Sequence, residues 1–198
     1  YLEILSDGSY DHVMAGSEMI SMRWFMGAKV NYAEHILRHE RDATAEEVAL
    51  YHSSEIRSPE TLSWSDLGDR VRAAAAQLRA LGLKPGDCVV SYMPNIPETA
   101  IAMLAATAIG AVWSAAAPEF GVQTVVDRFS QIQPKLIFAA DGYSYAGNRF
   151  DRRAVVKEIV DQLPSIERIV WLSYLGLERP ADFPRETLAW DTFLSVPG

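Results

Sequence analysis

The chain has 198 residues, of which 49% are hydrophobic and 22% are charged, a composition typical of a globular protein that buries a core. Its formal net charge of −8 argues against broad binding to nucleic acid, because neutralising phosphates requires a cationic surface. No uninterrupted apolar stretch approaches the roughly 18 to 20 residues that a membrane-spanning helix needs, and no signal-peptide pattern is present. The single cysteine, Cys88, excludes an internal disulfide and suits a reducing compartment, so we expect a cytoplasmic protein.

Residues 1–41 show no steady hydrophobic period and predict an extended arm or linker. Three aromatic residues of this arm, Trp24, Phe25 and Tyr32, are expected to anchor it on another surface. A helix is predicted over Asn31–His39, with Asn31 capping its start. The apolar runs at 48–53 and 61–64 flank a turn-rich segment and predict a small β-hairpin.

The middle of the chain alternates apolar strands with amphipathic helices about every 25 residues. Strands are predicted over residues 88–93, 111–116, 135–140 and 168–172. Helices are predicted over residues 65–81, 95–110, 122–133 and 151–163. Asn95 and Glu98 form a capping-box variant at the second helix, and Gly82 can end the first. The tail from Ser173 is predicted to be mostly loop, with one helical turn at Trp190–Leu194.

This alternation predicts an α/β fold, because parallel strands need crossover connections of helical length. We expect a partial, doubly wound, mostly parallel sheet with flanking helices, preceded by the arm and the hairpin. Residues 42–198 would then form the first part of a large α/β domain.

Several kinds of catalytic site are not supported by the sequence. The four histidines (His12, His35, His39 and His52) lie in no Cys/His cluster that would bind a metal ion. Neither a nucleophile elbow of the form G-x-S-x-G nor a glycine-rich phosphate loop of the common types is present.

Two segments at predicted strand ends could bind a ligand. Gly142–Arg153 places Arg149, Arg152 and Arg153 near two glycines, where the arginines could contact phosphate or could simply pair with Asp151 and Glu158. The small residues of Ala115–Gly121 could let a ligand approach the backbone, with Phe120 as a wall, or could only pack beneath a helix.

Three motifs resemble the N-terminal part of acetoacetyl-CoA synthetases, within the adenylate-forming ligase superfamily. They are R-W-F-x-G-A-x-x-N-Y-A-E from Arg23, P-E-F-G from Pro118, and V-x-D-R-F-x-Q-I-x-P-K from Val125. Acetyl-CoA synthetases tend to carry two glycines followed by Ser-Pro-Glu where P-E-F-G stands. Met26 departs from the family pattern, in which proline is common.

The resemblance implies that a longer parent enzyme joins acetoacetate, ATP and CoA through an acyl-adenylate, with Mg²⁺, and releases AMP and diphosphate. It implies that Ala117, Pro118, Glu119 and Phe120 line the path of the pantetheine arm, and that Arg149 lies near the 3′-phosphate of CoA. A second family arginine falls at Tyr145, so a two-arginine clamp does not match.

The chain is expected to be an N-terminal fragment without catalytic residues. Alone it should be inactive, should bind no cofactor tightly and should self-associate through exposed apolar surface. Two alternatives remain open at this stage: a synthetase for acetate or propionate, and a truncated, non-catalytic module that binds CoA or a partner.

Overall fold

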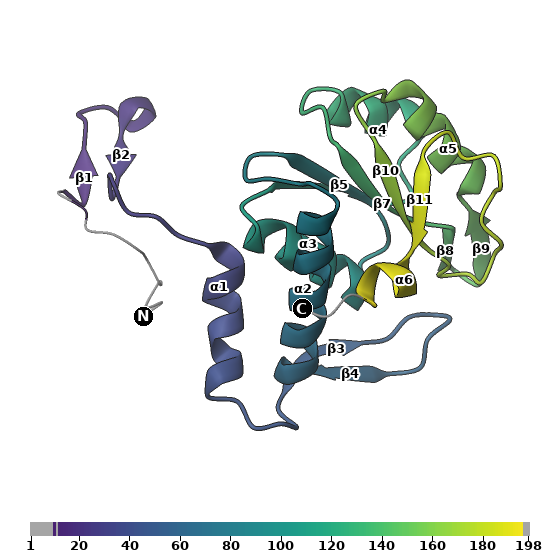
Figure 1. Ribbon diagram of the computed structural model, residues 1–198, viewed down its shortest axis with the longest axis horizontal. Helices are drawn as coiled ribbons and strands as arrows, with labels where there is room; N and C mark the ends of the chain where they lie inside the picture. Colours follow the sequence, from purple (N-terminus) through teal and green to yellow (C-terminus); the bar gives the residue numbers. More distant parts are fainter. Residues whose placement is uncertain (1–9, 11, 196–198) are drawn as a thin grey trace.

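The computed structural model describes residue 10 and residues 12–195, in which an α/β body follows an N-terminal arm (Figure 1). The body contains a five-stranded sheet in the order β11-β10-β7-β5-β6, and every neighbouring pair is parallel. Its strands are β5 (Cys88–Tyr92), β6 (Val112–Ala116), β7 (Leu136–Ala140), β10 (Arg168–Leu172) and β11 (Glu186–Ala189). The predicted α/β class with a parallel sheet is therefore confirmed.

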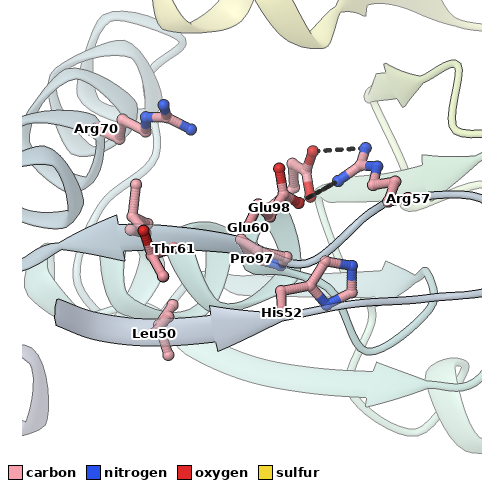
Figure 2. A pocket seen from close by; sticks show the side chains of 9 residues that line it. Leu50, His52, Arg57, Glu60, Thr61, Arg70, Pro97 and Glu98 are labelled. Atoms are coloured by element: carbon pink, nitrogen blue, oxygen red, sulfur yellow. Dashed lines mark hydrogen bonds and ion pairs between the residues drawn. The ribbon is translucent and has the colours of Figure 1, made fainter.

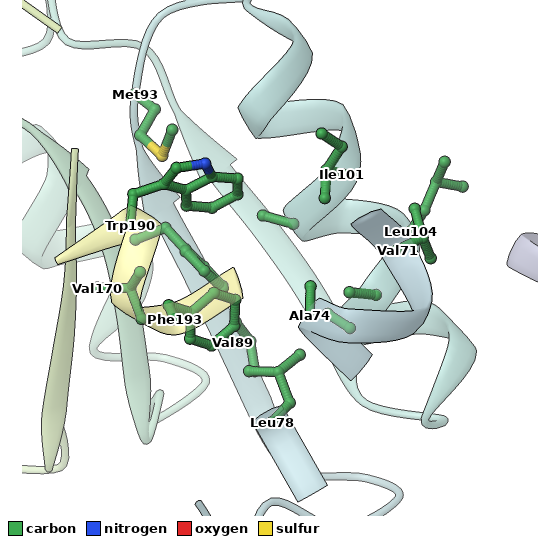
Figure 3. Close-up of a cluster of buried hydrophobic side chains, with 14 of the residues drawn as sticks. Val71, Ala74, Leu78, Val89, Met93, Ile101, Leu104, Val170, Trp190 and Phe193 are labelled. Atoms are coloured by element: carbon green, nitrogen blue, oxygen red, sulfur yellow. The ribbon is translucent and has the colours of Figure 1, made fainter. Parts of the chain in front are cut away.

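Helices cover both faces of this sheet, because alternate strand residues point to opposite sides. On β7, Phe138 belongs to one apolar cluster and Ile137 to the other. The first cluster contains residues of α1 (Tyr32–Leu37), α2 (Trp64–Ala80), α3 (Pro97–Ala108) and α6 (Trp190–Leu194), several of which are drawn in Figure 3. The second cluster contains residues of α4 (Val122–Phe129) and α5 (Arg153–Gln162).

Helix ends follow local chemistry at some positions. Ser63 caps α2 by accepting the backbone N–H of Asp66 at 3.1 Å, and Gly82 follows that helix with a φ of +88°, as predicted. The predicted cap at Asn95 is wrong. Ile96 is the N-cap of α3 and its apolar side chain makes no capping hydrogen bond, while Pro97 takes the first helical position, where a residue without an N–H is tolerated.

The predicted helices over 122–133 and 151–163 are too long. Helix α4 ends at Phe129, and Gln133, which precedes a proline, has a φ of +47°. Helix α5 begins only at Arg153, because the residues before it form a hairpin of β8 (Gly142–Tyr145) and β9 (Asn148–Asp151). The sequence interpretation also missed β11, which adds a parallel strand in the segment predicted to be mostly loop.

A second hairpin, formed by β3 (Val48–His52) and β4 (Glu60–Ser63), is antiparallel and confirms the predicted small hairpin. Before it, Asn31 caps α1 as predicted, and its side-chain amide also donates to the carbonyls of Thr107 and Ala108 at the end of α3. Helix α1 is followed by the short 3-10 helix η2 (Arg38–Arg41). Asn31 thus ties the end of the arm to the body.

The arm carries a two-residue ladder of β1 (Met14–Ala15) and β2 (Arg23–Trp24), with the 3-10 helix η1 (Met19–Ser21) between them. Figure 1 shows this ladder apart from the body. Trp24, Phe25 and Tyr32 are 60%, 46% and 55% exposed, so their predicted anchoring role stays a prediction. Within the described residues, no helix is both long and apolar enough to cross a membrane.

Candidate functional site

A cavity of ≈ 230 Å³ lies where the parallel strands end. The segments after β5, β6 and β10, the strand β8 that follows β7, and the end of β3 with the residues after it all contribute to its wall. Its lining residues are His52, Ser53, Ser54, Pro94, Asn95, Ile96, Ala117, Pro118, Glu119, Tyr143, Ser144, Tyr145 and Tyr174.

The strand order explains why the cavity forms there. The connection from β5 leads to β6 on one side, whereas the chain then crosses to β7 on the other side of β5. Open parallel sheets bind ligands in the crevice outside the carboxyl ends of the strands at such a reversal. The cavity therefore occupies the usual position of a ligand site in this class of fold.

One wall of the cavity is the segment after β6, which contains Ala117, Pro118 and Glu119. The Tyr92 hydroxyl lies 2.7 Å from the carbonyl oxygens of both Pro118 and Phe120. Burial raises the pKa of Tyr92 to about 12, so the hydroxyl stays protonated and able to donate near neutral pH. Tyr92 thus holds this wall from beneath.

Arg152 connects that wall to the β8–β9 hairpin. Its Nε donates to the Pro118 carbonyl at 2.8 Å, and its Nη2 donates to the Tyr143 hydroxyl at 3.1 Å. The guanidinium also lies 5.1 Å from the centroid of the Tyr143 ring, which stacks on Phe150 at 4.8 Å. The Arg152 guanidinium is therefore engaged in contacts within the chain that hold the cavity wall in place.

The other two arginines of this segment differ from Arg152 and from each other. Arg153 forms an ion pair with Asp151 at 2.8 Å, which matches half of the structural alternative considered from the sequence. Arg149 is exposed on β9, opposite Ser144 in the ladder, and makes no hydrogen bond or ion pair with the described residues. Arg149 is the arginine whose guanidinium is available to a ligand.

The structure brings together only part of the predicted site. Ala117, Pro118 and Glu119 line the cavity, and so does Tyr145. Phe120 lies outside the lining, 40% exposed, with the Arg128 guanidinium 4.9 Å from its ring centroid.

Asp141, which sequence reasoning missed, is a buried acidic residue directly after β7. Its side chain is fully buried, and its two carboxylate oxygens accept the backbone N–H groups of Leu175 and Leu177, each at 2.8 Å. It thereby fastens the loop after β10 to the end of β7. An acidic residue directly after an apolar strand was the available signal, although such a residue is more often solvated.

A smaller cavity of ≈ 80 Å³ lies beside the site, between the β3–β4 hairpin and the start of α3 (Figure 2). Arg57 pairs with the Glu98 carboxylate at 2.9 Å across its edge, and it also lies 4.8 Å from the Tyr174 ring centroid. His52 borders both cavities, and its buried Nε2 has no hydrogen-bond partner. The Arg57 contacts fix the loop between β3 and β4 against the body.

The chain folds into an α/β domain with a cavity at its strand ends, and comparison with known proteins identifies its family. The family model for AMP-binding enzymes matches residues 37–191, most of the chain. The chain belongs to the AMP-binding enzyme family.

Several relatives of this chain are acetoacetyl-CoA synthetases. The protein of that name from Rattus norvegicus is 41% identical over 197 residues, and that from Rhizobium meliloti is 37% identical over 163 residues. These matches cover 97% and 82% of this chain, but only 29% and 24% of the relatives. The structure of the acetoacetyl-CoA synthetase from Streptomyces lividans superposes with a TM-score of 0.92 at 39% identity, over 100% of this chain and 30% of that one.

Family membership raises the question of a metal ion. Among the described residues, no group of three or more His, Cys, Asp and Glu side chains is placed to hold one. We therefore assign no Mg²⁺ ligand and no metal-dependent step to this part of the chain.

Proposed function

We propose that this chain is the N-terminal part of an ATP-dependent acetoacetate–CoA ligase. Residues 1–41 would be the arm and residues 42–198 the first part of the large N-terminal domain. The observation that carries the proposal is the similarity to acetoacetyl-CoA synthetases over 97% of the chain, combined with a TM-score of 0.92 over all of it.

In the proposed reaction, a carboxylate oxygen of acetoacetate attacks the α-phosphorus of ATP, and diphosphate leaves. The CoA thiolate then attacks the carbonyl carbon of the acyl-adenylate, and AMP leaves. The described residues would take part in CoA binding, and the groups that bind ATP, Mg²⁺ and the acyl chain would belong to the portion of the relatives that this chain does not match. The 198-residue chain alone is then expected to be inactive.

For CoA, we propose that the pantetheine chain passes Ala117, Pro118 and Glu119, and that Phe120 lines the outer end of this path. Ala117 and Pro118 have small side chains on this wall of the cavity, which suits a narrow, flexible ligand. Arg149 would contact the 3′-phosphate, because its guanidinium is free while Arg152 and Arg153 are engaged.

The test replaces Arg149 by alanine in the full-length ligase. A charge-assisted contact to an exposed phosphate is worth about 1 to 3 kcal/mol, so KM for CoA should rise roughly 5- to 150-fold. Acetoacetate-dependent ATP–diphosphate exchange, which needs no CoA, should stay near wild type. The matched control is Arg153→Ala, which removes a guanidinium bound to Asp151 and should leave KM for CoA nearly unchanged.

Dephospho-CoA separates a phosphate contact from a structural effect, since the mutant and the parent should use it equally well. An Arg149 variant that loses exchange activity, or that still discriminates against dephospho-CoA as the parent does, would contradict the assignment. Exchange by the purified 198-residue chain alone would contradict the proposal that it is an inactive part. Exchange with acetate or propionate, and none with acetoacetate, would reassign the substrate.

A further inference from the structure

The tip of the β8–β9 hairpin is a tight turn at Ala146 and Gly147, whose φ angles are +51° and +74°. Such angles suit glycine, but they place an alanine in a region that L-residues rarely adopt. The turn brings two consecutive backbone N–H groups to one side, the arrangement that binds anions in many proteins.

That anion-binding turn is filled from within the chain, by Glu55. The Glu55 carboxylate accepts the N–H of Ala146 at 2.7 Å, the N–H of Gly147 at 3.1 Å and the hydroxyl of Ser144 at 2.9 Å. The three donors belong to one hairpin, whereas Glu55 lies about 90 residues earlier, in the loop between β3 and β4. The contact therefore joins two separate elements.

The loop that carries Glu55 is itself held on both sides. The Tyr174 hydroxyl donates to the Ser54 side-chain oxygen at 2.8 Å, so the loop is fastened to the segment after β10. Arg57 fastens it to α3 through Glu98. The loop is thus a fixed support, and the turn at the end of a two-stranded ribbon is the part that Glu55 holds in place.

We infer that Glu55 is a positioning residue that sets the mouth of the strand-end cavity. Ser53 and Ser54 line the cavity from the loop after β3, and Tyr143–Tyr145 line it from β8. Glu55, which follows Ser54, joins these two segments through its hydrogen bond with Ser144. Ser144, which Glu55 binds, is the register partner of Arg149. We call the contact of Glu55 with Ser144, Ala146 and Gly147 the clamp. The effect of the clamp on CoA binding rests on the proposed function, whereas the existence of the clamp does not.

The clamp is tested first in the 198-residue chain by amide hydrogen exchange. Glu55→Ala should accelerate exchange at Ala146 and Gly147 by about threefold or more, and Glu55→Gln, which keeps one acceptor oxygen, should give a smaller increase. Glu46→Ala, at an exposed glutamate outside the clamp, should leave both amides unchanged. Unchanged exchange in Glu55→Ala would overturn the inference.

The consequence is tested in the full-length ligase. Glu55→Ala should raise KM for CoA by roughly 3- to 10-fold with kcat and ATP–diphosphate exchange preserved, and Glu55→Gln should recover part of the loss. A lower KM would show that Glu55 competes with the CoA phosphate for the turn, and an unchanged KM with faster amide exchange would show that the turn does not shape the site. Either result overturns the positioning role. If the parent uses no CoA, the proposed function fails, and amide exchange alone decides whether the clamp exists.

Discussion

The N-terminal arm and the α/β body differ in how much of their apolar surface they bury. Of the 14 large hydrophobic side chains that are exposed in the described part of the chain, ten lie between Tyr10 and Tyr32 and four lie in all the rest. The body closes both faces of its sheet with its own helices, whereas the arm has only a two-residue ladder of its own. An isolated two-stranded ribbon is marginally stable in water.

The difference shows that the body is stabilised by its own contacts and that the arm is not. The stability of the body comes from contacts within the described residues, whereas the arm presents Met19, Ile20 and Trp24 to solvent. Exposed apolar groups gathered in one segment are typical of an interaction surface. The same substitution, Trp→Ala, should therefore change the free energy of unfolding by very different amounts in the two regions.

Trp190→Ala should produce the largest loss of stability. Trp190 is 7% exposed and lies beside Phe193 in Figure 3. Its ring centroid is 5.9 Å from that of Phe193 and 6.0 Å from that of Phe138. Truncating a buried Trp costs about 3 to 5 kcal/mol, since it removes buried area and leaves a cavity. Urea unfolding of the 198-residue chain would measure the change, and a loss below about 1 kcal/mol would show that α6 is not part of the core.

Asp141→Asn should have an intermediate effect. An asparagine keeps one acceptor oxygen but turns an amide N–H₂ toward a backbone N–H, so one of the two buried donors at Leu175 and Leu177 loses its acceptor. An unpaired buried group costs about 1 to 3 kcal/mol. Asp161→Asn is the matched control, because this exposed carboxylate pairs with Lys157, 3.5 Å away, and should matter by less than about 0.5 kcal/mol. Equal effects of the two substitutions would show that Asp141 does not hold the loop after β10 in place.

The regions also differ in how far the sequence predicts them. In the body, buried strands and amphipathic helices carry strong periods, so β5, β6, β7 and β10 were predicted close to their observed bounds. β11 was missed because its four residues, Glu186–Ala189, are exposed or only half-buried, and its pairing with β10 is a tertiary effect. The β8–β9 hairpin was missed because mixed polar residues flank a two-residue turn that includes an alanine in a left-handed conformation.

The candidate site was predictable only where it follows a strand end. Ala117, Pro118 and Glu119 follow a buried strand, so their place at the cavity could be expected from parallel topology. The contacts of Arg152, Asp141 and Glu55 join segments far apart in the chain, and no local pattern specifies them. Local sequence also could not separate the three arginines, since their roles depend on which carbonyl or carboxylate lies nearby.

Trp24→Ala should have the smallest effect on folding and sharpens the comparison most directly with Trp190→Ala. Trp24 is 60% exposed and lies in the two-residue ladder of the arm, so its truncation should change the free energy of unfolding by less than about 0.5 kcal/mol. Its effect should fall on self-association instead. If the chain self-associates through the arm, the variant should bind less of a dye that reports exposed apolar groups and should sediment closer to the monomer.

A loss of stability above about 1 kcal/mol would mean that the arm packs on the body in solution. Unchanged stability with unchanged dye binding and sedimentation would move the predicted self-association from the arm to the body, where Val112 on the edge strand β6 is 46% exposed.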